Sequence, residues 1–501
     1  MNVLDKIIFA ISPEWGVKRE AWRQTSDALR NYDAGKNDRL NSGWSPIWND
    51  SATLTDSAQR DTIRARVRDL ERNSDVANGI ISAWVRNVVG RGFTLQSKTE
   101  DAKLNEAIEK AWARWCKAKN CDVTGVQCFR EIMRTISQRK YVDGGILIVK
   151  AITNFGEFPL QLQILEVDEF DTGATNPHFK GNTIVDGVET TSFGRVVGYH
   201  IKKYNADGTP GSESEFYDAR KVIYYYSKTR PSQVREMSQL AHTISRIRDI
   251  TSYMEAVSVK ERIGACLAVF VKKVLPGAGG LGRSSKLGNM PGSGGYGGKS
   301  ITPGMITELQ PGDDIAVVNP PNQGGSATDF VRLQQRLSGA GQGLSYETTS
   351  RDMSQVNYSS ARQGLIEDER TYGIEQDNIV EHVLSDIYES FITLAVMSGD
   401  IDIPGFWDDP QKYLAHTWAA QGRKWIDPQK EANANRIAMQ TAQKTFQQVC
   451  LEQGLDWKDV LNEWETAQQY AKEKGIDLYA WIAKRPTEQK NGTTTIRSDV
   501  Q

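Results

Sequence analysis

The glycine-rich stretch in the middle of the chain holds the patterns closest to a nucleotide-binding motif. Residues 277–282 match G-x-G-x-x-G, a spacing that in a dinucleotide site sets the pyrophosphate against the start of a helix. Here glycine, serine and proline follow instead, so we expect a mobile loop. Residues 298–300, Gly-Lys-Ser, resemble the end of a phosphate-binding loop. However, Ser293 stands where the first glycine is needed, and Pro303 disfavours the required helix. The stretch predicts no nucleotide hydrolysis.

An acidic run could supply the carboxylates of a two-metal site for phosphodiester cleavage. Its members are Glu166, Asp168, Glu169 and Asp171. The run lies where a predicted strand enters a turn, and solvated carboxylates are common in turns. No basic or metal-binding partner accompanies the run in the sequence, so a nuclease is the less favoured interpretation.

The cysteines and histidines do not form a metal-binding pattern. Cysteines occur at 116, 121, 128, 266 and 450, and the first three lack both the paired C-x-x-C spacing and a near fourth ligand. An odd number of cysteines without a secretory leader predicts reduced, buried thiols. The histidines are scattered, with no H-E-x-x-H, at 178, 200, 242, 382 and 416. We therefore expect no metal and no cofactor.

The overall charge limits what the chain can bind. A net charge of -2 and a pI near 6.3 argue against tight binding of nucleic acid, because phosphate neutralisation needs a surplus of Lys and Arg. The first twelve residues, MNVLDKIIFAIS, are too short and too charged for a signal peptide or membrane helix. We expect them to form an amphipathic arm that docks on a neighbour.

Apolar residues recur at three- and four-residue intervals in several segments, which predicts helices. In the first of them, Ile63, Val67 and Leu70 share one face, and a break is expected near Asn73. Gly373 is expected to bend the longest helix. The predicted helices span 57–89, 104–115, 129–141, 234–264, 328–341, 359–398, a segment from Asp427-Pro428 to about Cys450, and 457–474.

Between the helices lie β-rich segments and irregular ones. Residues 145–227 predict an antiparallel meander, and CLAVFVKKV a further strand, followed by two short strands around Pro311-Gly312. Residues 343–357 are polar and irregular, and the tail from Pro486 is expected to be disordered. The sequence predicts an α+β fold that is mainly helical.

Segments in chain order resemble the lambda family of phage portal proteins. Residues 339–370 contain the sequences S-Y-E and N-Y-S-S-A-R, which are typical of the family. The full segment is GAGQGLSYETTSRDMSQVNYSSARQGLIEDER. Three other segments also match those of the family, in the same order: RDLERNSDVANGIISAWVRNVVGRGFTLQ, KTRPSQVREMSQLAHTI and WIDPQKEANA. This resemblance covers most of the chain. The chain differs from the family at residues 277–298, which look like a local insertion.

The resemblance implies a non-enzymatic subunit of a closed dodecameric ring at the unique capsid vertex. Such a ring forms the channel for DNA packaging and ejection and nucleates capsid assembly. Its implied partners are copies of itself, double-stranded DNA without sequence specificity, terminase, major capsid and scaffolding proteins, and the head-tail connector, with no membrane. Its implied location is the virion, with the host cytoplasm during assembly.

The portal plan of wing, stem, clip and crown implies a division of the chain. It consists of an arm and wing at 1–233, stem helices at 234–264 and 326–342 around a clip at 265–325, a tunnel loop at 343–358, a long wing helix and return at 359–425, crown helices at 426–485, and a disordered tail at 486–501.

The resemblance places a loop toward DNA whose members are Arg351, Asp352, Met353, Ser354, Gln355, Val356 and Asn357. Side chains of these types can touch phosphate or sugar without reading base edges. A nearly neutral chain suits sliding DNA, because every phosphate gripped by a cation must be released at each step. The alternative interpretation is a solvent-exposed loop without contacts. Alternative functions are a DNA-processing enzyme of the packaging machinery and a monomeric tail adaptor.

Overall fold

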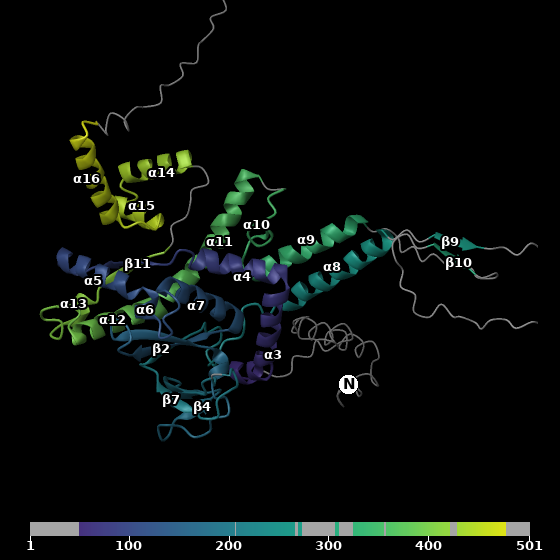
Figure 1. Ribbon diagram of the computed structural model, residues 1–501, viewed down its shortest axis with the longest axis horizontal. Coiled ribbons are helices and arrows are strands. Elements are labelled where there is room, and N and C mark those ends of the chain that lie inside the picture. The colour runs from purple at the N-terminus through teal and green to yellow at the C-terminus, as the bar shows by residue number, and fades with distance from the viewer. Residues whose placement is uncertain are drawn as a thin grey trace, which may run out of the picture. The chain divides into compact units, whose positions relative to one another are not determined.

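The computed structural model describes residues 50–205, 207–265, 269–272, 306–309, 324–354, 357–420 and 428–476 (Figure 1). The chain divides into two units, residues 1–55 and 56–501, and the elements below belong to the second, apart from the first turn of α3. Several predicted features lie outside the described residues: the amino-terminal arm, Cys266, the glycine-rich stretch, the strand after Pro311-Gly312, the Asp427 cap and the tail.

The first predicted helix is two helices, α3 (Ala52–Asn73) and α4 (Asp75–Val88). Ser74 separates them because its backbone is extended and its hydroxyl accepts a hydrogen bond from Ala77 N at 3.4 Å. The predicted break near Asn73 is confirmed. Helices α5 (Ala102–Trp115), α6 (Ala118–Cys121) and α7 (Phe129–Asp143) follow.

Residues 145–227 form two antiparallel sheets. One has the order β3-β2-β8, from β2 (Ile146–Ile152), β3 (Leu160–Leu165) and β8 (Val222–Tyr225). The other runs β4-β5-β6-β7, from β4 (Thr183–Val185), β5 (Val188–Thr190), β6 (Val196–Ile201) and β7 (Glu215–Asp218).

The predicted antiparallel direction of the strands is confirmed. The predicted meander order is wrong, because β8 pairs with β2 and not with the strand that precedes it in the chain. The reason is burial on both faces of β2. Ile146 and Ile148 point into one apolar cluster, and Leu147 and Val149 into another. A strand buried on both faces is stable only with partners on both edges.

A short sheet joins distant parts of the chain. Strand β1 (Thr94–Ser97) pairs antiparallel with β11 (His416–Ala419). This pairing was not predicted from the sequence.

Helix α8 (Ile244–Ala265) begins ten residues later than predicted. Residues 234–243 form bends and turns instead, because two of their side chains make hydrogen bonds with backbone atoms elsewhere in the chain. Arg235 Nη2 donates to Val167 O at 2.8 Å, and Glu236 accepts from Ser227 N at 2.5 Å. Helix α9 (Gly324–Gly341) lies beside α8 (Figure 1), with the Tyr253 and Phe330 rings 4.8 Å apart. Strands β9 (Val269–Lys272) and β10 (Ile306–Leu309) pair parallel.

The long predicted helix from residue 359 to 398 is confirmed in extent. It consists of α11 (Tyr358–Ile379), a π-helical turn η3 (Val380–Leu384) and α12 (Ser385–Ser398). The irregularity lies at η3 and not at Gly373, whose backbone stays helical. Ser385 Oγ donates to Val380 O at 2.8 Å inside this widened turn.

The carboxyl-terminal helices differ from the prediction at one point. After α13 (Pro410–Tyr413) come α14 (Pro428–Gln440), α15 (Phe446–Glu452) and α16 (Trp457–Glu473). The helix expected to reach Cys450 is two helices, because Ala442 adopts a φ of 58° and Thr445 caps α15.

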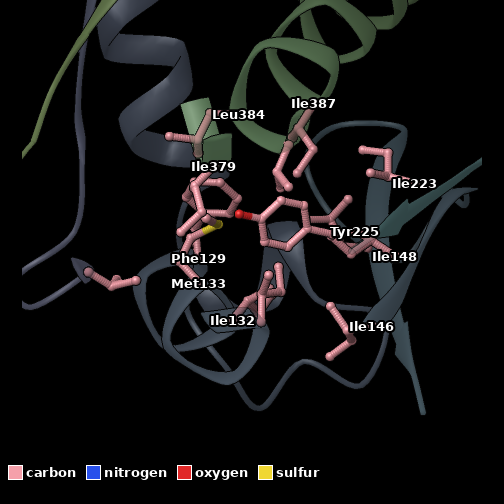
Figure 2. Close-up of a cluster of buried hydrophobic side chains, with 14 of the residues drawn as sticks. Phe129, Ile132, Met133, Ile146, Ile148, Ile223, Tyr225, Ile379, Leu384 and Ile387 are labelled. Atoms are coloured by element: carbon pink, nitrogen blue, oxygen red, sulfur yellow. The ribbon is translucent and has the colours of Figure 1, made fainter. Parts of the chain in front are cut away.

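The main apolar core lies where α7, sheet β3-β2-β8 and helices α11 and α12 meet. Figure 2 shows Ile132, Ile148 and Tyr225 facing Ile379 and Ile387 across it. An aromatic group extends this core, in which Phe391 lies 5.3 Å from Trp112, 5.4 Å from Trp115 and 5.2 Å from Phe158 between ring centroids.

We expect Phe391→Ala to lower the free energy of unfolding by about 3–5 kcal/mol, because the lost contacts leave a cavity in a close-packed region. Urea unfolding of the free subunit measures this. Phe193 is 98% exposed, so Phe193→Ala is the control and should change the midpoint little. Equal effects of the two substitutions would contradict this account of the core.

Candidate functional site

The acidic run is neutralised by arginines from α3. Asp168 Oδ2 lies 2.6 Å from Arg68 Nη2, and Asp168 Oδ1 lies 3.0 Å from Arg64 Nε. Arg68 also pairs with Glu166 at 3.1 Å. The expectation that the run has no basic partner is therefore wrong. The partners come from a helix 100 residues earlier, which local sequence cannot reveal.

The run does not form a metal site. Glu169, at the end of the 3-10 turn η2 (Val167–Glu169), accepts from Glu166 N at 2.9 Å, and Asp171 pairs with Lys202 at 2.9 Å. Within the described residues, no group of three or more His, Cys, Asp or Glu could hold a metal ion.

The cysteine Cys121 and the histidine His200 are buried among groups of the fold itself. Cys121 is buried, and burial raises the pKa of its thiol to about 12, so it is unreactive near neutral pH. His200 Nε2 lies 2.9 Å from the buried Glu189. Burial opposes ionisation of Glu189, but hydrogen bonds from Asn182 and the backbone of Phe179 outweigh it and lower the pKa to about 2.

The candidate loop begins at the end of a short helix that the sequence did not predict, α10 (Tyr346–Ser350). Ser345 caps it by accepting from Thr348 N at 3.4 Å. Arg351 ends it in the left-handed region with a φ of 58° and donates its N–H to Glu347 O at 2.9 Å. The Ser-Tyr-Glu signal of residues 345–347 is thus a helix start.

Within the loop, Asp352 is held and its neighbours are exposed. Asp352 Oδ2 accepts from Tyr346 at 3.1 Å, and Oδ1 accepts from Ser354 N at 3.0 Å. These bonds, with Ser354 foremost, lower the pKa of Asp352. Arg351 and Ser354 are exposed, and Met353 is 61% exposed.

The loop ends at a second cap. Asn357 accepts from Ser360 N at 2.9 Å at the start of α11. Gln355 and Val356 lie outside the described residues. Arg351, Met353 and Ser354 therefore remain as side chains able to meet a ligand, whereas Asp352 and Asn357 are engaged within the fold.

The buried carboxylate of Asp368 fixes α10 to α11. It accepts from Ser345 N at 2.6 Å, from Ser345 Oγ at 2.7 Å and from Thr348 Oγ1 at 2.6 Å. Three hydrogen bonds to one charged group are stronger than neutral ones. The base of the loop is thus firmly placed.

A buried charged cluster fixes α11 in turn to the core. Lys140 Nζ on α7 lies 3.0 Å from Glu375 Oε2 on α11 and 4.0 Å from Glu236 Oε1. Tyr225 donates to Glu375 at 2.8 Å. Burial, opposed by Lys140, raises the pKa of Glu236 to about 7.

Comparisons with known proteins agree with the motifs. The family model described as "Phage portal protein, lambda family" matches residues 37–376, more than half of the 501 residues. The "Probable portal protein" of Halomonas phage phiHAP-1 is 23% identical over 95% of this chain and 93% of its own. "Portal protein B" of Escherichia phage lambda is 20% identical over 87% of this chain and 89% of its own.

A solved structure also aligns. A chain from the virion of a native gene transfer agent particle is 11% identical, covering 83% of this chain and 97% of its own, with a TM-score of 0.40.

We expect Glu236→Gln to remove a pH dependence of stability. The folded pKa of Glu236 near 7 lies above its ordinary value of 4.5, so the unfolded chain loses this proton first. The wild type should therefore lose on the order of 3 kcal/mol of stability as the pH rises from about 4.5 to 7.

The measurement is the urea midpoint of wild type and variant across this range. The difference between them should grow with pH, and Glu213→Gln, at an exposed position, should follow the wild type. If the urea midpoints of wild type and Glu236→Gln change with pH in parallel, Glu236 does not have the raised pKa assigned to it.

Proposed function

Because this chain belongs to the lambda family of phage portal proteins, we propose that copies of it form a closed ring around a channel for double-stranded DNA. The match of the family model to residues 37–376 carries this conclusion. The ring occupies one vertex of the capsid, where DNA enters during packaging and leaves during ejection.

Helices α8 and α9 make the proposed stem. The start of α8 meets the end of α9, since His242 Nε2 lies 2.9 Å from Gly341 O and Gln342 Nε2 lies 3.2 Å from Thr243 Oγ1. Together with the Tyr253–Phe330 contact, this makes the two helices antiparallel. Residues 265–325 between them make the clip.

The remaining parts follow the same plan. Residues 1–233 and 359–425 make the wing, residues 343–358 the tunnel segment and residues 426–485 the crown. The stem helix itself starts at Ile244 rather than at residue 234. The tunnel segment includes α10 and the first residue of α11, so among its described residues only 343–345, 351–354 and Asn357 lie outside helices.

Apolar side chains on the stem support assembly. Met254 and Val259 on α8, and Phe330, Leu333 and Leu337 on α9, are partly exposed. A ring needs a heterologous interface, in which one face of a subunit contacts a different face of the next. We assign this apolar surface to that interface, where burial of apolar area stabilises the contact.

The loop from Arg351 to Asn357 is the proposed contact with DNA. One exposed arginine per loop, beside Met353 and Ser354, offers weak phosphate contacts without base readout. A net charge of -2 keeps overall affinity low, which allows DNA to slide. The work of the subunit is mechanical, with no catalytic residue.

The partners proposed for the ring are terminase, the major capsid and scaffolding proteins, and the head-tail connector. The ring nucleates capsid assembly in the host cytoplasm and remains at the vertex of the virion. Within the described ranges, none of the helices has an apolar stretch of the length that a membrane span needs.

Negative-stain images of the purified full chain should show rings with a central hole. Leu333→Glu should greatly reduce the ring fraction, because it buries a charge in the proposed interface. Leu333 is 54% exposed in the single chain, so the subunit itself should still fold. Phe193→Glu, in a turn of the second sheet, is the matched control. Solitary particles from the wild type would overturn the proposal.

Replacing residues 353–356 by Gly-Ser-Gly-Ser should leave rings intact and reduce DNA packaging or retention. This change keeps the caps at Arg351 and Asn357, together with the held Asp352. The same replacement in the exposed turn at residues 191–194 serves as control. Loss of rings would show that the segment is structural, and undiminished packaging would show that residues 353–356 do not contact DNA.

A further inference from the structure

A groove of about 470 Å³ lies between helices α4 and α7. Ile81 and Val85 line it with apolar surface, and three arginines, Arg86, Arg91 and Arg134, line it with positive charge. No Asp or Glu is among the described residues that line it. A volume of this size can accept a large side chain, and the charges favour an acidic partner.

The carboxylates close to this groove along the chain are engaged elsewhere. Glu71 forms an ion pair with Arg139, and Glu131 accepts from Cys128 N at 2.9 Å. Arg134 donates from Nε to a neutral backbone carbonyl oxygen at 2.8 Å, which holds the side chain in place without cancelling its charge. The groove therefore keeps a positive character.

A loop of opposite charge joins α12 to α13. Its residues, 399–409, contain no Lys or Arg, and Lys412 beyond it pairs with Glu100 at 2.7 Å. Its four carboxylates are all exposed and belong to Asp400, Asp402, Asp408 and Asp409. We call this segment the Trp407 loop.

Trp407 projects from the loop, while its neighbours are held. Its side chain is 62% exposed, whereas Phe406 beside it is 1% exposed. Gly405 makes the turn between core and surface with a φ of 79°, and the Tyr413 hydroxyl donates to Pro404 O at 3.1 Å. A loop that is anchored in this way presents Trp407 with little entropy left to lose on binding.

The Trp407 loop does not reach the groove of its own subunit. Gln376 Nε2 donates to Val88 O at 3.0 Å, which places the end of α4 beside α11. From Gln376 the helical run continues about 33 Å to Ser398, at the usual rise per residue. Figure 1 shows α13 at the far end of α12 from α4. Contact between loop and groove therefore requires two molecules.

We propose that Trp407 of one subunit enters the α4–α7 groove of the next copy in the ring, with the aspartates of the loop facing the arginines of the groove. An aromatic side chain in a pocket commonly supplies much of the energy of an interface, and opposite charges around it fix the partner and its orientation. The contact joins two different surfaces, which is the heterologous type that a closed ring needs. This inference rests on the proposed function and adds a second contact, separate from the stem.

The first test measures ring assembly of the full chain by sedimentation velocity over a series of protein concentrations. Trp407→Ala should raise the concentration for half-assembly at least tenfold, because the aromatic anchor is lost. Phe193→Ala, at a position that is 98% exposed, is the control and should assemble like the wild type. Equal assembly of Trp407→Ala and the wild type would overturn the inference.

The second test uses charge reversal. Arg86→Glu in the groove, and the double variant Asp408→Lys/Asp409→Lys in the loop, should each impair assembly at least tenfold because like charges then face each other. An equimolar mixture of the two variants should recover rings, since alternating subunits pair every groove with a loop of opposite charge. A folding defect in either variant would not be repaired by mixing.

The outcomes separate this inference from the proposed ring. Wild-type rings together with a mixture that recovers no assembly, or with charge variants that assemble normally, would overturn the loop-in-groove contact and leave the ring intact. A wild type that forms no rings would overturn both.

Discussion

The buried ammonium of Lys140 is the constraint on which the positions of several elements depend. With no exposed surface, it needs carboxylates within reach, because an unpaired charge in this environment would cost several kcal/mol. Glu375 on α11 supplies the nearer one at 3.0 Å, and Glu236 on the segment before α8 lies 4.0 Å away. Helix α7, helix α11 and the approach to α8 can therefore pack in few other arrangements. From Glu375, α11 runs about 27 Å back to Asn357 at the usual helical rise, so the charged cluster also sets where the loop projects.

Much of the local structure could be predicted from the sequence. The apolar spacing of Ile63, Val67 and Leu70 and the break expected near Asn73 are local signals, and the helices they predict are present. The predictions that proved wrong depended on hydrogen bonds between residues far apart in the sequence. Arg235 and Glu236 look like helix residues, yet they bond the backbone of Val167 and Ser227. Strand β8 follows β7 in the chain but pairs with β2, since only the folded core shows that β2 is covered on both faces.

The candidate loop was identified by its motif, and its interior could only partly be foreseen. Polar residues predicted an irregular segment, but Ser345 and Asp368 make a hydrogen-bonded helix of its first part. Two caps then confine the exposed Arg351 and Met353 to a short span. For the DNA contact that we propose, a loop held between two anchored helices would keep its place while the polymer moves past it.

The pairing of β1 with β11 ties together residues 94–97 and 416–419. During synthesis, β1 leaves the ribosome long before its partner exists, and its hydrogen-bonding edge stays open for that interval. A nascent or truncated subunit that stops short of residue 416 presents this edge to any other chain. This pairing can therefore form only after residues 416–419 have been synthesised, and a chain that ends before them leaves the β1 edge open to pairing with another strand.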